Sequence, residues 1–186
     1  MMRLSTGLIF LFVILLGCSK ANKIYFVRHA EKGTAPAGDP DLTAAGIQRA
    51  EALEKLLRGN GIEAIYSTET GRTRQTAGPL SRSIGIPIRS YSNDTTQKFL
   101  YHLLANEQNS LVVGHSNTVL KMIRDLGLTP AVKEIFDNDY DNLFIVTQKT
   151  KSGVGGYKLS LRERTYGKRS PSGTDGVPGT GPSMMK

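Results

Sequence analysis

The sequence predicts an α/β domain of three layers, α/β/α, built on a mainly parallel central sheet. Short apolar runs typical of buried strands alternate along the chain with segments whose apolar residues recur at helical spacing. Glycine and asparagine separate many of these segments, as turns require. The chain has 186 residues and 39% hydrophobic content, which is enough for one such domain with its own core.

The expected elements follow one another in the order typical of this fold class. Thr43 is placed to cap the first helix, and Pro79 inside the second predicts a kink or an early turn there. Pro87 favours an edge position for the third strand. The first helix carries an apolar stripe made of Ile47, Ala50, Leu53 and Leu57, with Arg49 among the residues outside it. The expected strands cover 23–27, 62–66, 86–91, 111–113, 144–147 and 157–161, and the later helices cover 72–84, 97–105 and 119–126.

The positive charge of the chain is concentrated toward its C-terminal end. The formal net charge is +8, and from Lys149 onward eight Lys and Arg face two acids, which leaves only +2 for residues 1–148. No basic stripe with interleaved aromatic residues runs through the body, so we do not expect the domain to bind nucleic acid. From residue 167 the chain is rich in Ser, Pro, Gly and Thr, which predicts a disordered basic tail at 167–186 that folding does not need.

The N-terminal segment has the pattern of a secretory signal. Arg3 precedes an apolar run at 8–16, which is too short to span a membrane as a helix. The sequence Leu-Leu-Gly-Cys at 15–18 resembles the lipobox of bacterial lipoproteins, in which Cys18 is lipidated and becomes the mature N-terminus. We therefore expect a signal peptide at 1–17, a tether at 18–22 and a folded domain at 23–166. The alternative is a plain signal peptide with an incidental cysteine.

Unusual polar residues follow three of the predicted strands. Arg28 and His29 come directly after the first strand, Arg72 lies just beyond the second, and His115 follows the fourth. In an open α/β sheet, ligands bind at the carboxyl ends of the strands, so we expect these side chains to line one site. His102, inside a predicted helix, is assigned to packing or to the surface.

This set of residues suits the transfer of a phosphoryl group. Guanidinium groups present forked donors that match phosphate oxygens, and an imidazole can attack phosphorus. Arg28, Arg72 and His115 would then stabilise the charge of the transition state. The sequence has no P-loop, no cysteine set and no carboxylates clustered at strand ends, so we expect no metal ion and no cofactor.

Three ordered motifs resemble the histidine phosphatase superfamily, in its phosphoglycerate mutase-like branch. They are R-H-A-E-K at 28–32, S-T-E-T-G-R-T-R-Q-T-A at 67–77 and V-V-G-H-S-N-T at 112–118. The resemblance covers about residues 23–166 and implies a phosphoglycerate mutase-like fold. It further implies that His29 is the phosphorylated nucleophile, that Arg28 and Arg72 hold the phosphoryl group, that His115 completes the pocket and that Asn117 adds a polar contact.

The chain departs from the family pattern in two places. Ala30 stands where the first motif usually has glycine, and alanine is small enough for the loop to survive. The family's general acid is commonly a Glu or Asp on an insertion that is nearly absent here. Between Arg72 and His115 only Asp94 and Glu107 are acidic, and Asp94, in a loop after a strand, is the better candidate. The alternative for Asp94 is a solvated loop acid.

The leading hypothesis is a metal-independent phosphomonoester hydrolase that works through a phosphohistidine on His29. The substrate would be a small phosphorylated molecule or peptide. The protein would act as a monomer, held at a bacterial cell envelope by Cys18, where it would face the periplasm or lie on the outer membrane. Two alternatives remain open. One is a phosphoglycerate mutase-like phosphotransferase, and the other is a non-catalytic phosphate-binding module on the same fold.

Overall fold

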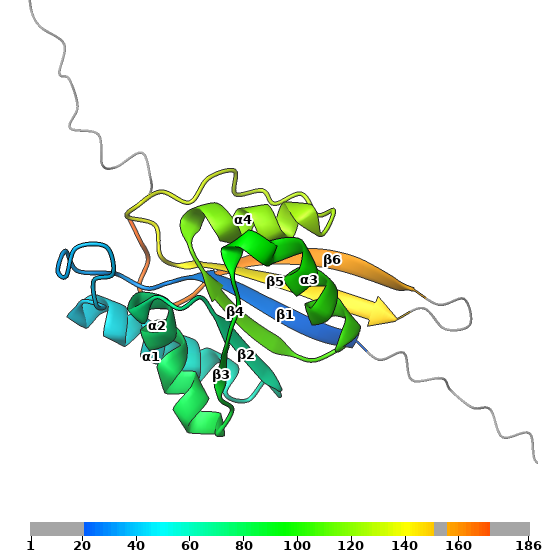
Figure 1. The fold of residues 1–186 in the computed structure, drawn as a ribbon, viewed down its shortest axis with the longest axis horizontal. Helices are drawn as coiled ribbons and strands as arrows, with labels where there is room; N and C mark the ends of the chain where they lie inside the picture. The colour runs from blue at the N-terminus through cyan, green and yellow to red at the C-terminus, as the bar shows by residue number, and fades with distance from the viewer. Residues whose placement is uncertain (1–20, 151–155, 172–186) are drawn as a thin grey trace, which may run out of the picture.

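The computed structural model describes residues 21–150 and 156–171 as a six-stranded sheet between two layers of helices (Figure 1). The predicted signal peptide, Cys18 and most of the predicted tail lie outside these ranges. The strands are β1 (Ala21–Arg28), β2 (Ala64–Ser67), β3 (Ile88–Ser90), β4 (Ser110–Gly114), β5 (Asn142–Thr150) and β6 (Tyr157–Thr165). The helices are α1 (Ala44–Leu57), α2 (Gly71–Ile84), α3 (Thr96–Ala105) and α4 (Ser116–Asp125), with a 3-10 turn η1 (Asn93–Thr95) before α3. No helix within the described ranges is long and apolar enough to cross a membrane.

The predicted fold class is confirmed. The strand order is β3-β2-β4-β1-β5-β6, in which β1 to β4 pair in parallel and the β5–β6 hairpin is antiparallel. β3 lies at an edge, as Pro87 predicted. Helices α1 and α2 cover one face of the sheet, and α3 and α4 cover the other (Figure 1).

Strand β1 shows why the apolar run at its centre is nearly continuous. Ile24 and Phe26 pack among the residues of α3 and α4, whereas Tyr25 and Val27 pack among those of α1 and α2. A strand at the centre of a sheet covered on both faces buries every side chain, so alternation with polar residues disappears.

Several boundaries differ from the predicted ones. Strand β1 begins at Ala21, inside the predicted tether, and α2 continues without a break past Pro79. Helix α4 begins at Ser116, three residues earlier than expected, with His115 as its N-cap. The hydroxyl of Thr118 accepts a hydrogen bond from the His115 N–H at 3.0 Å, which satisfies a backbone donor that a helix start leaves free. The consequence is that His115 lies at the first turn of a helix, not in a loop.

The buried face of α1 also differs from the predicted stripe. Ile47 is exposed, whereas Gly46 and Arg49 are buried with the rest of the stripe. Arg49 is buried because its guanidinium pairs with the carboxylate of Glu31 at 2.7 Å and donates to the carbonyl oxygen of Tyr166. These are long-range contacts, which helical spacing cannot reveal.

The predicted boundary of the tail at residue 167 is wrong for its first few residues. Arg49 donates to the carbonyl oxygen of Lys168 at 2.8 Å. The hydroxyl of Ser170 accepts from the Tyr140 N–H at 2.9 Å, and the Ser170 N–H donates to the carboxylate of Asp141 at 3.2 Å. Residues 167–171 are therefore part of the folded domain, held by polar contacts that their composition does not indicate.

Candidate functional site

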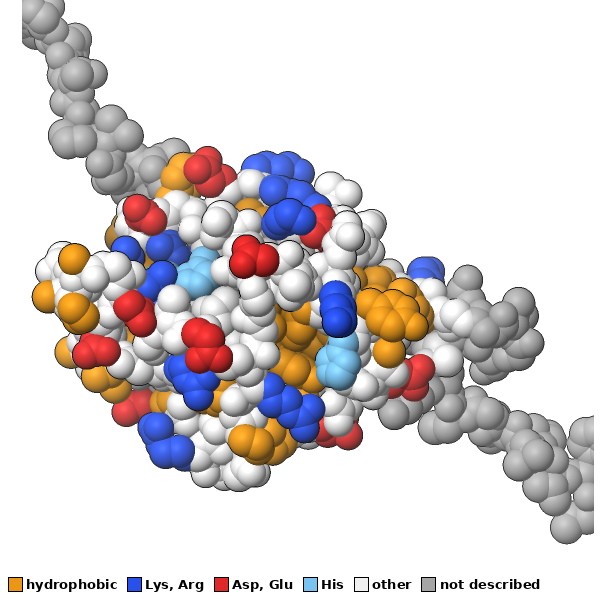
Figure 2. Space-filling view, in the orientation of Figure 1, with side chains coloured by type: hydrophobic (Ala, Val, Ile, Leu, Met, Phe, Trp, Pro, Cys, Tyr) orange, Lys and Arg blue, Asp and Glu red, His pale blue; other side chains and the backbone are white. Residues whose placement is uncertain are grey.

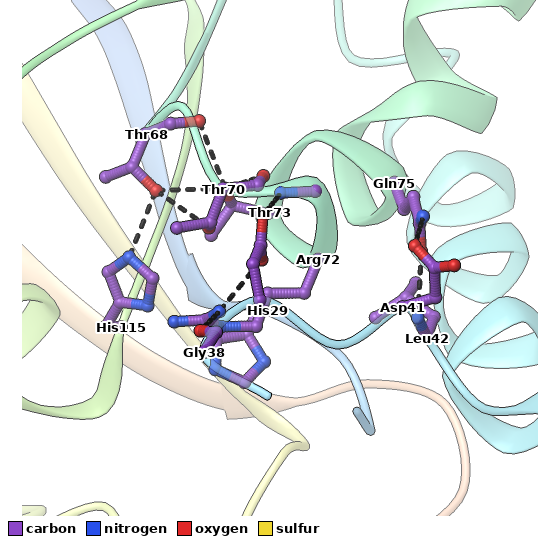
Figure 3. A network of polar contacts seen from close by, with 12 residues as sticks. His29, Gly38, Asp41, Leu42, Thr68, Thr70, Arg72, Thr73, Gln75 and His115 are labelled. Atoms are coloured by element: carbon purple, nitrogen blue, oxygen red, sulfur yellow. Dashed lines mark hydrogen bonds and ion pairs between the residues drawn. The ribbon is translucent and has the colours of Figure 1, made fainter. Parts of the chain in front are cut away.

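Two neighbouring strands bring the two histidines of the motifs together. β1 and β4 are adjacent and parallel, with Arg28 paired to Gly114 in register. The His29 N–H donates to the carbonyl oxygen of Gly114 at 2.9 Å. The rings of His29 and His115 then lie with their centroids 5.6 Å apart (Figure 3). The sheet thus places both imidazoles at its carboxyl edge.

A pocket of about 460 Å³ opens over these two rings. Its lining includes His29, Arg28, Lys32, Arg72, His115 and Asn117. Figure 2 shows a histidine side chain at the surface beside Lys and Arg side chains, with Asp and Glu side chains around them. The start of α4 also reaches this pocket, and a helix N-terminus favours negative charge. The arrangement suits an anion such as a phosphoryl group.

The ring of His29 is oriented by its own neighbour. Its Nδ1 lies 2.8 Å from the carbonyl oxygen of Ala30, and because a carbonyl only accepts, Nδ1 carries the proton. The lone pair is therefore on Nε2. Burial lowers the pKa of His29 to about 3, an effect that the bond to Ala30 opposes and that the charges of Arg28, His115 and Arg72 reinforce. At neutral pH the ring is therefore uncharged.

The ring of His115 is held by a cluster of threonine hydroxyls. Its Nε2 lies 3.0 Å from the hydroxyl of Thr68, which in turn is 2.9 Å from that of Thr73 and 3.3 Å from that of Thr70 (Figure 3). Burial lowers the pKa of His115 to about 4, and the charge of Arg72 contributes next. The second histidine is therefore also neutral at physiological pH.

Arg28 is buried, and most of its donors serve the chain between α4 and β5. Its Nη1 donates to the carbonyl oxygens of Phe136 and Asp139 at 2.5 and 3.2 Å, and its Nη2 lies 3.3 Å from Asp137. The guanidinium lies over the ring of Tyr140, 4.5 Å from its centroid. Its buried Nε has no partner among the described residues. Arg28 therefore fixes the segment at 136–140 beside the pocket that it lines.

Arg72 lies in the first turn of α2 and reaches the long loop that follows β1. Its Nη1 donates to the carboxylate of Asp39 at 2.9 Å and to the carbonyl oxygen of Gly38 at 3.3 Å. The same carboxylate accepts from the Gly71 N–H at 2.7 Å, at the start of the helix. The loop at 32–41 therefore lies beside the site, where Lys32 lines the pocket and Asp39 holds Arg72.

Two small residues let the strand ends approach their neighbours. Ala30, in the position where the family usually has glycine, is fully buried, and its N–H donates to the hydroxyl of Thr76 at 2.9 Å. At Gly114 an added Cβ would lie 2.8 Å from the hydroxyl oxygen of Tyr91, which packs beneath the end of β4. A side chain at the position before His115 would therefore force the buried ring of Tyr91 to shift.

The candidate acids and the remaining polar residues are not all at the pocket. Asp94 is exposed in η1 and lines a neighbouring hollow, which it shares with His115 but not with His29. Glu107 lies before β4, at the opposite edge of the sheet, and accepts from the Thr150 hydroxyl. His102 is exposed on α3, as expected. Asn117 is exposed and lines the pocket.

Sequence reasoning missed two groups of residues at this site. The threonines around His115 belong to the second motif, so their presence there is a signal that could have found them. Asp137 and Tyr140 gave no such signal, because they lie outside the motifs. Asp137 lines the pocket, and the ring of Tyr140 lies with its centroid 6.2 Å from that of His29. Within 21–150 and 156–171, no three His, Cys, Asp or Glu side chains gather in a way that could hold a metal ion.

The resemblance to the histidine phosphatase superfamily is confirmed by comparison with known sequences. The model of the histidine phosphatase superfamily (branch 1) matches residues 24–93, which include the first two motifs. Probable phosphoglycerate mutases GpmB of Yersinia pestis (strain Pestoides F) and Yersinia pseudotuberculosis (serotype O:1b) are 32% identical over 72 residues, 36% of this chain and 34% of theirs. The match with this chain therefore spans about a third of the length of these curated relatives.

Solved structures share the fold over most of the chain. "Mycobacterial hydrolase 2" has a TM-score of 0.63 at 13% identity and covers 83% of this chain and 94% of its own. The putative phosphohistidine phosphatase SixA from Agrobacterium tumefaciens has a TM-score of 0.53 at 23% identity, covering 76% and 97%. A mycobacterial glucosyl-3-phosphoglycerate phosphatase has a TM-score of 0.58 at 14% identity, covering 76% and 97%. At these identities the likeness is one of fold.

Proposed function

We propose that this chain, which has the motifs and the fold of the histidine phosphatase superfamily, is a phosphomonoester hydrolase. It would act through a phosphohistidine on His29. One observation carries the proposal. His29 is an uncharged imidazole with its Nε2 lone pair available, in a pocket that it shares with Arg28, Arg72 and His115. The pocket lies open at the surface, which suits a phosphorylated small molecule or peptide.

The reaction has two displacements at phosphorus. Nε2 of His29 attacks the phosphorus atom, the bond to the ester oxygen breaks, and the leaving oxygen takes a proton. A water molecule then attacks the phosphohistidine and gives a proton to the group that protonated the leaving oxygen. The bond from phosphorus to Nε2 breaks, inorganic phosphate leaves, and the imidazole is restored. Donors from Arg28, Arg72 and the first turn of α4 would stabilise the charge on the transferring oxygens in both steps.

We propose Asp94 as the proton donor for the leaving oxygen. It is the carboxylate of η1 and lines the hollow beside His115, while Asn93 next to it lines the pocket of His29. Replacing Asp94 with Asn should lower kcat most for substrates with a poor leaving group and least for p-nitrophenyl phosphate, whose leaving oxygen needs little protonation. Equal losses for both classes of substrate would remove Asp94 from this role.

The test of the mechanism is to trap the phosphoenzyme. Rapid quench with a ³²P-labelled phosphoester should label the wild type with a bond that is labile in acid and stable in alkali. His29→Ala should give neither label nor turnover, whereas His102→Ala, on the surface of α3, should behave as the wild type. Full activity in His29→Ala would refute the proposal. A wild type that binds phosphate but shows neither label nor turnover would indicate the non-catalytic phosphate-binding module instead.

Arg72 offers a graded test with a matched control on the same helix. Arg72→Ala should reduce kcat/KM on the order of a hundredfold, because a preorganised donor to the transferring oxygens is lost. Arg74→Ala, whose side chain pairs with Glu69 outside the pocket, should change it by less than about twofold. Addition of a chelator should leave the wild-type rate unchanged, because guanidinium groups supply the positive charge.

A mutase is the second candidate, since the curated relatives are named probable phosphoglycerate mutases. The two functions differ in the acceptor of the phosphoryl group. Incubation with labelled phosphoglycerate should release inorganic phosphate if the chain is a hydrolase, whereas positional isomers without phosphate release would indicate a mutase.

We further propose that Cys18 anchors the protein to a bacterial envelope membrane. The lipobox-like sequence at 15–18 supports this, and the several acyl chains of a mature lipoprotein bind a membrane firmly. In fractionated cells the wild type should sediment with membranes and Cys18→Ala should shift to the soluble fraction or remain unprocessed. A soluble wild type would contradict the anchor.

A further inference from the structure

Five exposed cations lie on the part of the sheet that α1 and α2 do not cover. They are Lys23 on β1, Lys149 on β5, and Lys158, Arg162 and Arg164 on β6, and we call this surface the basic face. Sequence reasoning assigned the positive charge of the chain mainly to its C-terminal end. The structure gathers four of those charges on the hairpin and adds a fifth from the first strand.

The strand register puts the five side chains on one side of the sheet. Lys23 and Tyr25 alternate on β1 with residues that face α3 and α4. Directly opposite residues in antiparallel strands point to the same face, and Lys149 pairs with Ala21 on one side and with Lys158 on the other. Arg162 and Arg164 pair with Ile145 and Leu143, which belong to the α1 and α2 side of the core.

No acidic side chain within the described ranges pairs directly with these cations. None of the five cations makes an ion pair with a described residue. Glu163, the acid of β6, alternates to the opposite side, where its carboxylate accepts from the N–H groups of Ala131 and Val132 at 2.6 and 3.1 Å. The basic face therefore presents a net positive field to whatever approaches it.

A hollow of about 600 Å³ lies in the basic face, between the end of α1 and the hairpin. Its wall includes Leu56, which is 45% exposed, and its floor includes Ile145. Lys23, Arg162 and Arg164 stand around it. Apolar surface surrounded by cations matches lipid molecules, which have an anionic headgroup above a glycerol and acyl region.

The basic face begins close to the expected lipid anchor, which favours a membrane as its occupant. Lys149 and Lys158 are level with Ala21 at the start of β1, whereas Arg164 is level with Val27 near its end. The beginning of β1 and the turn end of the β5–β6 hairpin lie at one end of the molecule, and the loop that follows His29 lies at the other (Figure 1). Ala21 follows Cys18 by three residues, a reach of at most about 11 Å. Strand β1, of eight residues, separates the two ends by about 26 Å.

We infer that the basic face binds the anionic headgroups of a lipid bilayer. Single-stranded nucleic acid is the less suitable occupant. Binding of that kind uses exposed aromatic rings as stacking surfaces. The aromatic residue of the hollow, Tyr25, is only 4% exposed. The inference depends on the cations of the sheet and not on an acyl group, so it can be tested whether or not Cys18 is lipidated.

The test compares two variants of equal charge in full-length chains that carry Cys18→Ser, so that no acyl group contributes. The hairpin variant replaces Lys149, Lys158, Arg162 and Arg164 with Gln. The control variant replaces Lys55, Arg82, Arg89 and Lys98 with Gln, which are exposed cations of other surfaces. Binding to vesicles of phosphatidylcholine, with and without about 30% phosphatidylglycerol, is measured by sedimentation over a range of salt concentrations.

We expect the parent chain and the control variant to bind the anionic vesicles more tightly than the neutral ones, with an affinity that falls as salt rises. The hairpin variant should bind at least about tenfold more weakly, since each cation near the surface contributes. Its hydrolysis of p-nitrophenyl phosphate should equal that of the control variant, which shows that both fold. Equal vesicle binding by the two variants would overturn the inference. The inference would also be overturned if the parent chain bound a DNA oligonucleotide more tightly than vesicles at the same salt concentration, and if only the hairpin variant lost this DNA binding.

Discussion

At the scale of single residues, the chemistry of the site depends on the surroundings of one imidazole. His29 is at the end of a buried strand, where water is largely excluded and three positive or ionisable groups lie near it. Both conditions disfavour its charged form. The ring therefore keeps a free Nε2 over the whole physiological range, which an exposed histidine would not do below its ordinary pKa.

This low pKa predicts how stability changes with pH. Between about pH 6.5 and 4 the unfolded chain protonates His29 while the folded chain does not, so the unfolded state binds more protons and stability falls as pH decreases. His29→Asn should make that fall smaller. The measurement is the free energy of unfolding in urea at pH 7, 6, 5 and 4.5. His102→Asn, on the surface, serves as the control. If the free energy of unfolding changed equally with pH in the wild type and in His29→Asn, His29 would not be held neutral in the folded chain.

At the scale of elements, helix α1 is placed by a close contact with the segment that carries the first motif. An added Cβ at Gly46 would fall on the carbonyl oxygen of Glu31. The same carbonyl accepts from the Thr43 N–H at 2.9 Å, and the Thr43 hydroxyl accepts from the Gly46 N–H at 3.1 Å. The start of the helix and the residues after His29 therefore fix each other.

Replacing Gly46 with Ala tests this contact. Alanine favours a helix by about 1 kcal/mol over glycine, but here a backbone atom must move, and we expect a net destabilisation of about 1–3 kcal/mol. Gly59→Ala, where an added Cβ meets open space, should be neutral or slightly stabilising. Urea denaturation of both variants makes the comparison. A Gly46→Ala protein as stable as the wild type would mean that the helix can shift away from Glu31 without cost.

At the scale of the whole molecule, the residues after β6 connect α1 to the wall of the pocket. Lys168 is held by Arg49, and Ser170 is held by Tyr140, whose ring lies against Arg28. A segment that composition alone assigns to a disordered tail therefore supports the position of the Arg28 guanidinium beside the pocket.

Two truncated chains distinguish the contribution of residues 167–171 from that of the rest of the tail. A chain that ends at residue 171 should keep the stability and KM of the full chain. A chain that ends at Tyr166 should lose about 1–2 kcal/mol, through the contacts of Lys168 and Ser170, and should show a raised KM because Tyr140 is released. Thermal unfolding and steady-state kinetics on p-nitrophenyl phosphate measure both. Equal behaviour of the two truncated proteins would show that residues 167–171 support nothing.

The sequence by itself determined the layers and the identity of the central residues. A nearly continuous apolar run marks a buried strand, and the carboxyl ends of parallel strands meet at one edge. The sequence alone therefore places Arg28, His29 and His115 together at that edge. These features depend on local pattern and on a topology shared by many chains.

Only the tertiary structure decided the rest, because it depends on contacts between residues distant in sequence. The carbonyl of Ala30 selects the tautomer of His29, and the chain near Asp137 occupies donors of Arg28 that sequence reasoning reserved for substrate. Arg49 is buried because Glu31 lies beside it in space. In the same way, the register of β5 and β6 turns separate basic residues into one charged surface, which no single stretch of the chain reveals.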